Sequence, residues 1–239
     1  MTNNRSQHLI LKNLCVAILA ILGFFAAQFV VAAVMIVAVM LYHMLVLHMT
    51  SAAAYGNAAS LLTSHQVSLL ILSELLFLAM VFLIVKLRHS SLADAIGLKR
   101  TSFWSLVSYM ILGFILNFVT VLVISLIPFP QTWVSNYVET SSLIGQEGFL
   151  MLAIASVLIA PVTEEVLFRG LIYRHFHRAM PRFFAIVTES LIFGALHESP
   201  IWILYGFAMG VVLTLVYERK GNLAYSIAVH IGFNLIGIL

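Results

Sequence analysis

Long stretches of apolar residues occupy most of this chain of 239 residues, and their length limits what it can fold into. They cover residues 14–47, 67–85, 104–127, 149–168, 183–197, 201–217 and 223–239. A membrane-spanning helix needs about 20 apolar residues, so these stretches predict about seven crossings, of which the fifth and sixth are short. Only 9% of the residues are charged, against about 25% in soluble domains. The predicted fold class is therefore an all-α, polytopic membrane helical bundle.

The first apolar stretch follows Arg5 and Lys12, as the apolar part of a secretory signal peptide would. However, the stretch continues for about 30 residues, well beyond a signal peptide's apolar region, and no obvious small-residue cleavage site ends it. We therefore expect a retained membrane anchor. The single cysteine, Cys15, lies inside it, which excludes an intramolecular disulfide.

The placement of basic residues predicts the orientation of the helices. The 12 Lys and Arg residues fall within residues 5–12, 86–100, 169–182 and 219–220, at alternate ends of the expected helices. The loops between, at residues 48–66, 128–147 and 198–200, contain none. Because cytoplasmic loops carry an excess of Lys and Arg, this alternation predicts a cytoplasmic N-terminus. No basic face with interleaved aromatic residues lies outside the apolar stretches, so we expect no nucleic acid partner.

Ionisable residues are unevenly distributed along the chain. The first three apolar stretches carry almost none, whereas roughly the last ninety residues carry most of them. We therefore divide the chain into N-terminal membrane helices and loops, residues 1–144, and a C-terminal core, residues 145–239, in which any chemistry should lie. A short interfacial helix is expected within residues 128–147.

Several polar side chains fall inside the C-terminal apolar stretches. A charged residue at the centre of a membrane helix costs roughly 2.5 to 3.5 kcal/mol, so such residues usually face a cavity and have a function. Successive helical residues are about 100° apart, so Glu165 and Arg169, at positions i and i+4, share one face and can form an ion pair, while Glu164 points elsewhere. The candidates are Glu164, Glu165, Arg169, Glu189, His197, His230 and Asn234.

Three helices can bring four of these side chains to a similar depth. Glu164 precedes Pro181, and His197 follows it, by almost the same number of residues, so both should lie about 25 Å from the turn. His230 and Asn234 share a face at roughly 15 and 20 Å beyond Lys220. A carboxylate and a histidine can deprotonate a water and later protonate a leaving amine. A second histidine and an amide can stabilise an oxyanion, so the set suits amide hydrolysis.

At these residues the chain resembles the CPBP family of intramembrane proteases, which contains type II CAAX prenyl endopeptidases and bacteriocin-processing and self-immunity proteins. The family's motifs EExxxR, FxxxH and HxxxN match, in order, Glu164 to Arg169, Phe193 to His197 and His230 to Asn234. The resemblance covers residues 145–239. It implies an intramembrane endopeptidase of a bacterial cell membrane that acts on peptide or protein substrates at the lipid bilayer.

The resemblance also implies a role for each matched residue. Glu164 would activate the water, assisted by His197, and His230 and Asn234 would donate hydrogen bonds to the oxyanion. Glu165 and Arg169 would be a structural pair. Phe193, one turn before His197, would pack against its ring.

The need for a metal is a separate question. Catalytic zinc usually takes three protein ligands, often from an HExxH sequence, which this chain lacks. Glu164, His197 and His230 could supply three ligands, but we favour a reaction without a metal or other cofactor.

Other functions remain open at this point. Within the family, the chain could be a bacteriocin self-immunity protein. Outside it, the chain could be a transporter or a non-catalytic scaffold, in which Glu164 pairs with a donor on another helix and His230 and Asn234 hold helices together. A transporter often shows two repeated halves, and no repeat is visible. We expect structural or supporting roles for Glu189 and a contact between helices for Glu74.

Overall fold

The computed structural model describes residues 2–144, 148–197 and 199–238, and all of its regular elements are helical. The predicted all-α membrane bundle is therefore confirmed. The N-terminal elements are α1 (Thr2–Leu45), α2 (Ser51–Ser64), α3 (Gln66–Leu87), α4 (Leu92–Ile96), α5 (Phe103–Ser125) and α6 (Gln131–Ile144). The C-terminal elements are α7 (Phe149–Ala153), η2 (Ile154–Ile159), α8 (Ala160–Glu165), η3 (Val166–Tyr173), α9 (Arg174–Ala179), α10 (Arg182–Ala195), α11 (Pro200–Lys220), α12 (Leu223–Asn234) and η4 (Leu235–Ile238).

Within the described residues, 5 helical segments are long and apolar enough to cross a membrane. They are Gln7–Leu45, Gln66–Leu87, Phe103–Ser125, Phe149–Ala179 and Pro200–Lys220. The remaining two predicted crossings correspond to α10 and α12, which have only 14 and 12 residues. Both pack against longer helices, α10 on α11 and α12 on α5, so protein covers much of their surface. The sequence-based count of about seven is therefore not reproduced by helix length.

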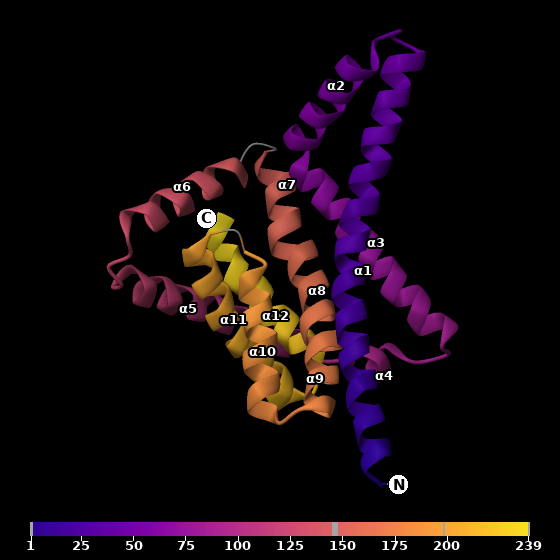
Figure 1. The fold of residues 1–239 in the computed structure, drawn as a ribbon. Coiled ribbons are helices and arrows are strands. Elements are labelled where there is room, and N and C mark those ends of the chain that lie inside the picture. The colour runs from indigo at the N-terminus through magenta and orange to yellow at the C-terminus, as the bar shows by residue number, and fades with distance from the viewer. Residues whose placement is uncertain (1, 145–147, 198, 239) are drawn as a thin grey trace.

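The loops without basic residues contain two further helices. We expected a loop at residues 48–66, but α2 forms there, and the Thr50 side chain caps it by accepting a hydrogen bond from the Ala53 amide at 3.4 Å. Helix α6 is the short helix expected within residues 128–147. Figure 1 shows α2 folded back along the end of α1, while α6 lies on the other side of the molecule. The predicted domain boundary at residue 145, the loop residue 198 and the chain end at 239 fall outside the described residues.

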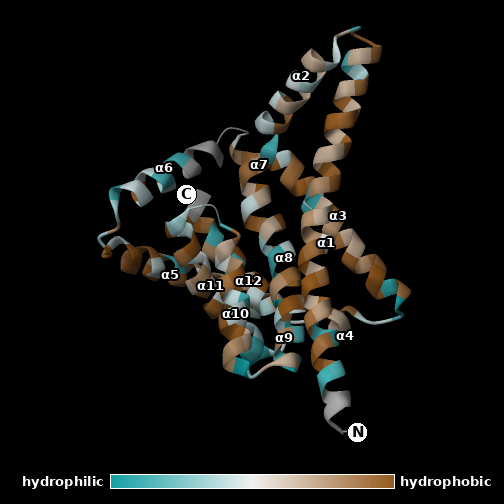
Figure 2. Cartoon of the chain, in the orientation of Figure 1, coloured by the Kyte–Doolittle hydropathy of each residue, from teal (hydrophilic) through white to brown (hydrophobic). Residues whose placement is uncertain are grey.

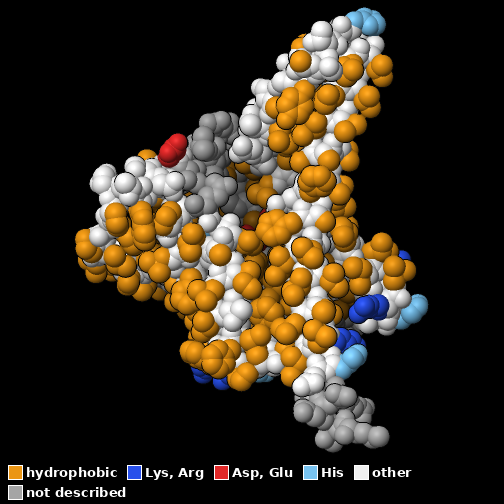
Figure 3. Space-filling model, viewed as in Figure 1, with side chains coloured by type: hydrophobic (Ala, Val, Ile, Leu, Met, Phe, Trp, Pro, Cys, Tyr) orange, Lys and Arg blue, Asp and Glu red, His pale blue; other side chains and the backbone are white. Residues whose placement is uncertain are grey.

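Apolar and basic side chains are separated in space as the orientation argument requires. Figure 2 shows brown, hydrophobic residues along the outer faces of α1, α3 and α5. Many of these residues are exposed, Phe29 at 74% and Leu122 at 53% among them, as expected for side chains that face lipid. Lys and Arg side chains gather at the end where α4 and α9 lie and where α1 begins (Figures 1 and 3).

The membrane-spanning segment Phe149–Ala179 is a continuous run of α-helical and π-helical turns. The π-helical stretches η2 and η3 lie on either side of α8, the short helix that carries the two adjacent glutamates. Such turns are rare and are frequently found at functional sites. They change the direction of side chains relative to an ideal helix, so spacing alone gives only approximate directions here.

Glycines bring the C-terminal helices close to one another. A Cβ at Gly232 of α12 would overlap the Met110 carbonyl of α5, and one at Gly113 of α5 would overlap the Val229 carbonyl of α12. Nearby, the buried Asn117 side chain donates a hydrogen bond to the Phe233 carbonyl. Because backbone meets backbone, this contact determines the position of α12 and of the histidine it carries.

Candidate active site

A buried arginine lies at the centre of the polar cluster. Arg169 of η3 has no exposed area, and its Nη1 atom lies 2.8 Å from Oε1 of Glu165, so the ion pair predicted from the spacing is present. Its Nε atom lies 3.3 Å from Oε1 of Glu189, and Nη2 donates to the Gly210 carbonyl at 2.9 Å. Arg169 thus links α8 to α10 and α11 rather than pairing with one glutamate alone.

Glu189 belongs to the same buried network. Its other oxygen, Oε2, accepts hydrogen bonds from Thr214 Oγ1 at 2.7 Å and from Ser190 Oγ at 3.3 Å. Thr214 Oγ1 also lies 3.3 Å from Nε of Arg169. Two carboxylates therefore share a single guanidinium inside the bundle, and hydroxyl groups satisfy part of the second carboxylate.

His230 of α12 lies between the two adjacent glutamates of α8. Its Nδ1 atom is 3.0 Å from Oε1 of Glu165, a hydrogen-bond distance, and its Nε2 atom is 3.6 Å from Oε2 of Glu164. The second distance is too long for a hydrogen bond. Among the described residues, the histidine within ion-pair range of Glu164 is thus His230 and not His197, because α12 packs directly against α8.

His197 follows the last turn of α10 and is held from two sides. Its Nδ1 atom lies 3.2 Å from the Phe193 carbonyl, and its ring contacts the Phe193 ring edge to face, with centroids 5.6 Å apart. The packing that the family resemblance implied is therefore present. On the other side, a Cβ at Gly206 of α11 would come within 2.9 Å of Nδ1, so only glycine leaves room for the ring in this position.

The Phe193 ring connects the ionic and imidazole parts of the site. The Arg169 guanidinium carbon lies 4.7 Å from its centroid, within the range of a cation–π contact. The His230 ring centroid is 6.0 Å from the same ring. Phe193 is 2% exposed, so its position is fixed by packing. Both site histidines therefore contact one buried aromatic ring.

Asn234 lies one turn beyond His230, as the sequence spacing requires. Its Nδ2 atom donates to the Ser156 carbonyl of the π-helical stretch η2 at 2.8 Å. An amide nitrogen carries two hydrogens, so one donor remains for another acceptor. The structure thus places His230 and Asn234 on the face of α12 that meets η2 and α8.

The first glutamate is only partly covered by the rest of the protein. The Glu164 side chain retains 26% of its accessible area, whereas Glu165 and Arg169 have none. The end of α1 and helix α2 project together from the molecule (Figure 1). In Figure 3 the surface is hollowed between this projecting part and the part of the molecule below α6. Glu74 of α3 is 2% exposed and interacts electrostatically with Glu164, and its Oε2 atom has no hydrogen-bond partner among the residues that the structure describes. It contributes a carboxyl group next to the site that the sequence motifs did not include.

The sequence offered Glu164, His197 and His230 as an alternative set of metal ligands. Within the described residues, no group of three or more His, Cys, Asp and Glu side chains is close enough to hold a metal ion. In this structure Glu164, His197 and His230 are thus not close enough together to bind one metal ion.

Sequence reasoning did not find the partners of Arg169 on other helices. Thr214 and the Gly210 carbonyl carry no chemical signature of their own. A signal for their helix was present, however, because Gly206 and Gly210 form a GxxxG pattern in an apolar segment, which is typical of close helix packing. A Cβ at Gly210 would come within 2.9 Å of the Ser190 Cβ, so this pattern marks the α10–α11 contact that carries Glu189.

The C-terminal part of the chain matches a known family. The model of the type II CAAX prenyl endopeptidase Rce1-like family matches residues 146–236. This range contains α7 to α12 and all of the site residues except Glu74. No solved structure matches the chain.

Three curated bacterial proteins are similar to the chain. UPF0177 protein YbdI of Lactococcus lactis subsp. lactis (strain IL1403) is 30% identical over 139 residues, which are 56% of this chain and 74% of YbdI. UPF0177 protein YaiH of the same strain is 39% identical over 35% of this chain and 34% of its own length. The protein named "Putative membrane peptidase YdiL" of Bacillus subtilis (strain 168) is 28% identical over 37% of this chain and 36% of its own.

The matches to YaiH and YdiL thus span only about a third of those proteins. The similarity to YbdI, by contrast, covers most of that protein at 30% identity. Together with the apolar spans, these bacterial relatives identify a multi-pass bacterial membrane protein. The chain belongs to the CPBP family of membrane peptidases, with an Rce1-like domain in its C-terminal part.

Proposed function

We propose that the protein is an intramembrane endopeptidase that hydrolyses peptide bonds of membrane-associated substrates with a water activated by Glu164. The observation that carries this proposal is the contrast between the two adjacent glutamates. Glu165 is fully buried and paired with Arg169, whereas Glu164 keeps 26% of its side chain accessible beside His230. An accessible carboxylate next to an imidazole can hold a water and remove its proton.

The first step is attack of the water on the scissile carbonyl carbon. Glu164 takes one proton from the water as the oxygen attacks, and the carbonyl oxygen becomes an oxyanion. The same carboxyl group, assisted by His197, then returns a proton to the leaving amine, and the C–N bond breaks. The half-buried ring of His197 supports this role, because its Nδ1 atom is directed to the Phe193 carbonyl and its Nε2 atom is not.

His230 and Asn234 would stabilise the oxyanion. As an imidazolium, His230 donates from both ring nitrogens, from Nδ1 to Glu165 and from Nε2 to the substrate oxygen. The 3.6 Å separation between Nε2 and Glu164 is consistent with a donor that is still available. Asn234 would donate its second amide hydrogen, since the first is bound to the Ser156 carbonyl. Donors held in place before the reaction stabilise the transition state most.

The buried network has a supporting task in this mechanism. Glu165 accepts from His230, and Arg169 holds Glu165 in turn, while Glu189, Thr214 and the Gly210 carbonyl fix the guanidinium. The orientation of the His230 ring is therefore set by contacts that reach α10 and α11. We propose that the reaction needs no metal ion, because these protein groups account for both proton transfer and oxyanion binding.

The test compares purified wild type with Glu164→Gln, which keeps the shape of the side chain but cannot take up the proton. Glu139→Gln, on the exposed face of α6, is the matched control. Each protein is assayed with a fluorogenic library of membrane peptides, with and without a chelator. We expect cleavage by wild type and the control and none by Glu164→Gln. Cleavage by Glu164→Gln at the wild-type rate would overturn the catalytic assignment, and loss with chelator that zinc restores would overturn the metal-free mechanism.

A further inference from the structure

A polar cavity lies at the end of the bundle where the basic residues gather, and none of its lining residues belongs to the candidate active site. Its volume is about 450 Å³, and the residues that line it come from α4, the loop after it, α9 and the end of α11. They include Asp94, Lys99, Arg174, Arg178 and Tyr217. None of these residues takes part in the proposed hydrolysis. The cavity therefore requires its own explanation.

The cavity carries an excess of positive charge. Lys99, Arg174 and Arg178 line it, against the single carboxylate of Asp94. That carboxylate already accepts a hydrogen bond from the Ser91 hydroxyl. Arg174 donates from Nη2 to the Asp94 carbonyl at 2.9 Å, and its guanidinium also interacts with the Tyr217 hydroxyl. Three cations around one carboxylate that is already hydrogen-bonded favour an anionic ligand.

The walls of the cavity are held together by contacts between distant parts of the chain. The Asn222 side chain accepts from the Lys99 amide at 3.0 Å and donates to the Lys99 carbonyl at 3.1 Å. The Leu223 amide donates to the Gly97 carbonyl at 3.0 Å. Gly97 has a φ of +76°, and a Cβ there would lie 2.5 Å from the Tyr217 hydroxyl and 3.3 Å from Arg174 Nη1. The space beside these two groups is thus kept open by a residue without a side chain.

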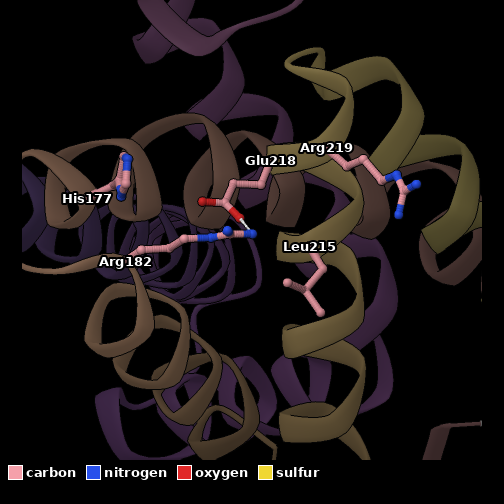
Figure 4. Close-up of a pocket in the computed structure, with 5 residues that line it drawn as sticks. All are labelled: His177, Arg182, Leu215, Glu218 and Arg219. Atoms are coloured by element: carbon pink, nitrogen blue, oxygen red, sulfur yellow. Dashed lines mark ion pairs between the residues drawn. The ribbon is translucent and has the colours of Figure 1, made fainter.

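A neighbouring cavity contains an arginine that is paired with a carboxylate of the protein. Figure 4 shows His177, Arg182, Leu215, Glu218 and Arg219 around a space of about 640 Å³. There the Arg182 guanidinium forms an ion pair with Glu218, which also accepts a hydrogen bond from the Tyr173 hydroxyl at 2.6 Å. Of the two arginines that line this neighbouring cavity, Arg182 thus has an acidic partner in the protein. The cavity lined by Lys99, Arg174 and Arg178 has three cations and one carboxylate, that of Asp94.

We propose that the cavity lined by Lys99, Arg174 and Arg178 binds the phosphate group of an anionic ligand at the basic end of the bundle. Arginine binds phosphate with two parallel hydrogen bonds, and lysine adds a point charge. The basic ends of membrane helices face the leaflet that carries anionic lipids, where basic pockets between helices bind phospholipid head groups. A phospholipid and a free phosphate share this chemistry, so the experiment must separate them.

The experiment uses the full-length protein purified in a non-ionic detergent. Thermal unfolding is followed while phosphatidylglycerol, phosphatidylcholine or inorganic phosphate is added, because a ligand that binds the folded state raises the unfolding midpoint. The test variant is Lys99→Gln/Arg178→Gln. The control is Lys86→Gln/Arg219→Gln, which removes the same charge from exposed positions outside this cavity. Arg174 is left in place because it holds α4 to α9.

We expect phosphatidylglycerol to raise the midpoint of wild type and of the control, and the test variant to bind it roughly 10-fold to 30-fold more weakly, as two lost charges at a membrane surface predict. A rise with inorganic phosphate that is lost in the test variant would also support the phosphate site and would identify a soluble source. The proposal is overturned if neither ligand raises the midpoint. It is also overturned if the test variant responds like the control, or if phosphatidylcholine acts as strongly as phosphatidylglycerol.

Discussion

The imidazole of His230 lies between Glu164 and Glu165, with Nδ1 3.0 Å from Glu165 and Nε2 3.6 Å from Glu164. The two adjacent glutamates of α8 thus interact differently with the same imidazole ring. Glu165 forms a hydrogen bond with His230 and an ion pair with Arg169, whereas Glu164 lies beyond hydrogen-bond distance and is partly accessible. The paired glutamate fixes the ring, and the other remains available for chemistry.

The first prediction concerns the hydrogen bond between Glu165 and His230, which orients the imidazole ring. Glu165→Leu removes the acceptor for Nδ1, so the ring loses its fixed orientation, while Glu164 remains. We expect kcat to fall by about 100-fold, since misplacement by about 1 Å can cost that much. KM should change little. Steady-state cleavage of a membrane peptide measures both constants, and Glu165→Gln, which keeps an acceptor, should recover part of kcat. Equal loss in both variants would contradict an orienting role.

A second prediction concerns the buried charges around Arg169. Arg169→Met leaves the carboxylates of Glu165 and Glu189 without their shared cation, so we expect a loss of about 3–5 kcal/mol in the free energy of unfolding. Adding Glu189→Gln removes one of the two carboxylates and should recover part of this loss, a coupling that a double-mutant cycle measures. Equilibrium unfolding in mixed detergent provides the data. Additive losses would show that the two side chains act independently.

The third prediction tests the close contact between α5 and α12. Gly232→Ala places a methyl group against the Met110 carbonyl, so the helices must separate, at a cost of about 3 kcal/mol or more. Gly23→Ala and Gly56→Ala are matched controls, because nothing lies within 4 Å of a Cβ at either position. We expect these two to unfold at or above the wild-type midpoint, as alanine favours helices over glycine. A Gly232→Ala protein as stable as the controls would refute the contact.

The fourth prediction concerns the space for His197. Gly206→Ala places a Cβ within 2.9 Å of the His197 Nδ1 atom, so the ring must move away from its place beside Phe193. We expect cleavage to slow by about 10-fold to 100-fold. The unfolding midpoint should fall less than in Gly232→Ala, because a side chain can shift more easily than a backbone. Unchanged cleavage by a folded Gly206→Ala protein would argue against a role for His197 at this position.

The fifth prediction separates Glu74 from the proposed base. Glu74 is buried on α3 and interacts with Glu164, and one of its oxygens has no hydrogen-bond partner within the described part of the chain. Glu74→Gln removes a buried carboxyl group whose negative charge would repel that of Glu164. The protein should therefore be at least as stable as wild type and should retain cleavage. Peptide cleavage and thermal unfolding are compared with Glu164→Gln. A folded Glu74→Gln protein that no longer cleaves would place Glu74 in the catalytic machinery.

Much of the candidate site could be predicted from spacing. The i, i+4 relation of Glu165 and Arg169 predicted their ion pair, because four residues bring side chains to one helical face. The ring contact of Phe193 with His197 was implied by the family resemblance, and their one-turn spacing allows it. The catalytic roles of Glu164, His197, His230 and Asn234, and the absence of a metal, stay predictions. The division of the chain near residue 144 and the cytoplasmic position of the N-terminus also stay predictions.

By itself, the sequence determined the class of fold and the local pairs. Apolar stretches long enough for lipid require membrane helices, and a helix of known pitch fixes which neighbours along it can meet. Only the tertiary structure decided that His230 lies beside Glu164, that Arg169 also pairs with Glu189, and that α10 and α12 have only 14 and 12 residues. These features depend on how helices pack against one another, which spacing along a single helix cannot specify. Glycines allow this close packing where α5 meets α12 and where α10 meets α11.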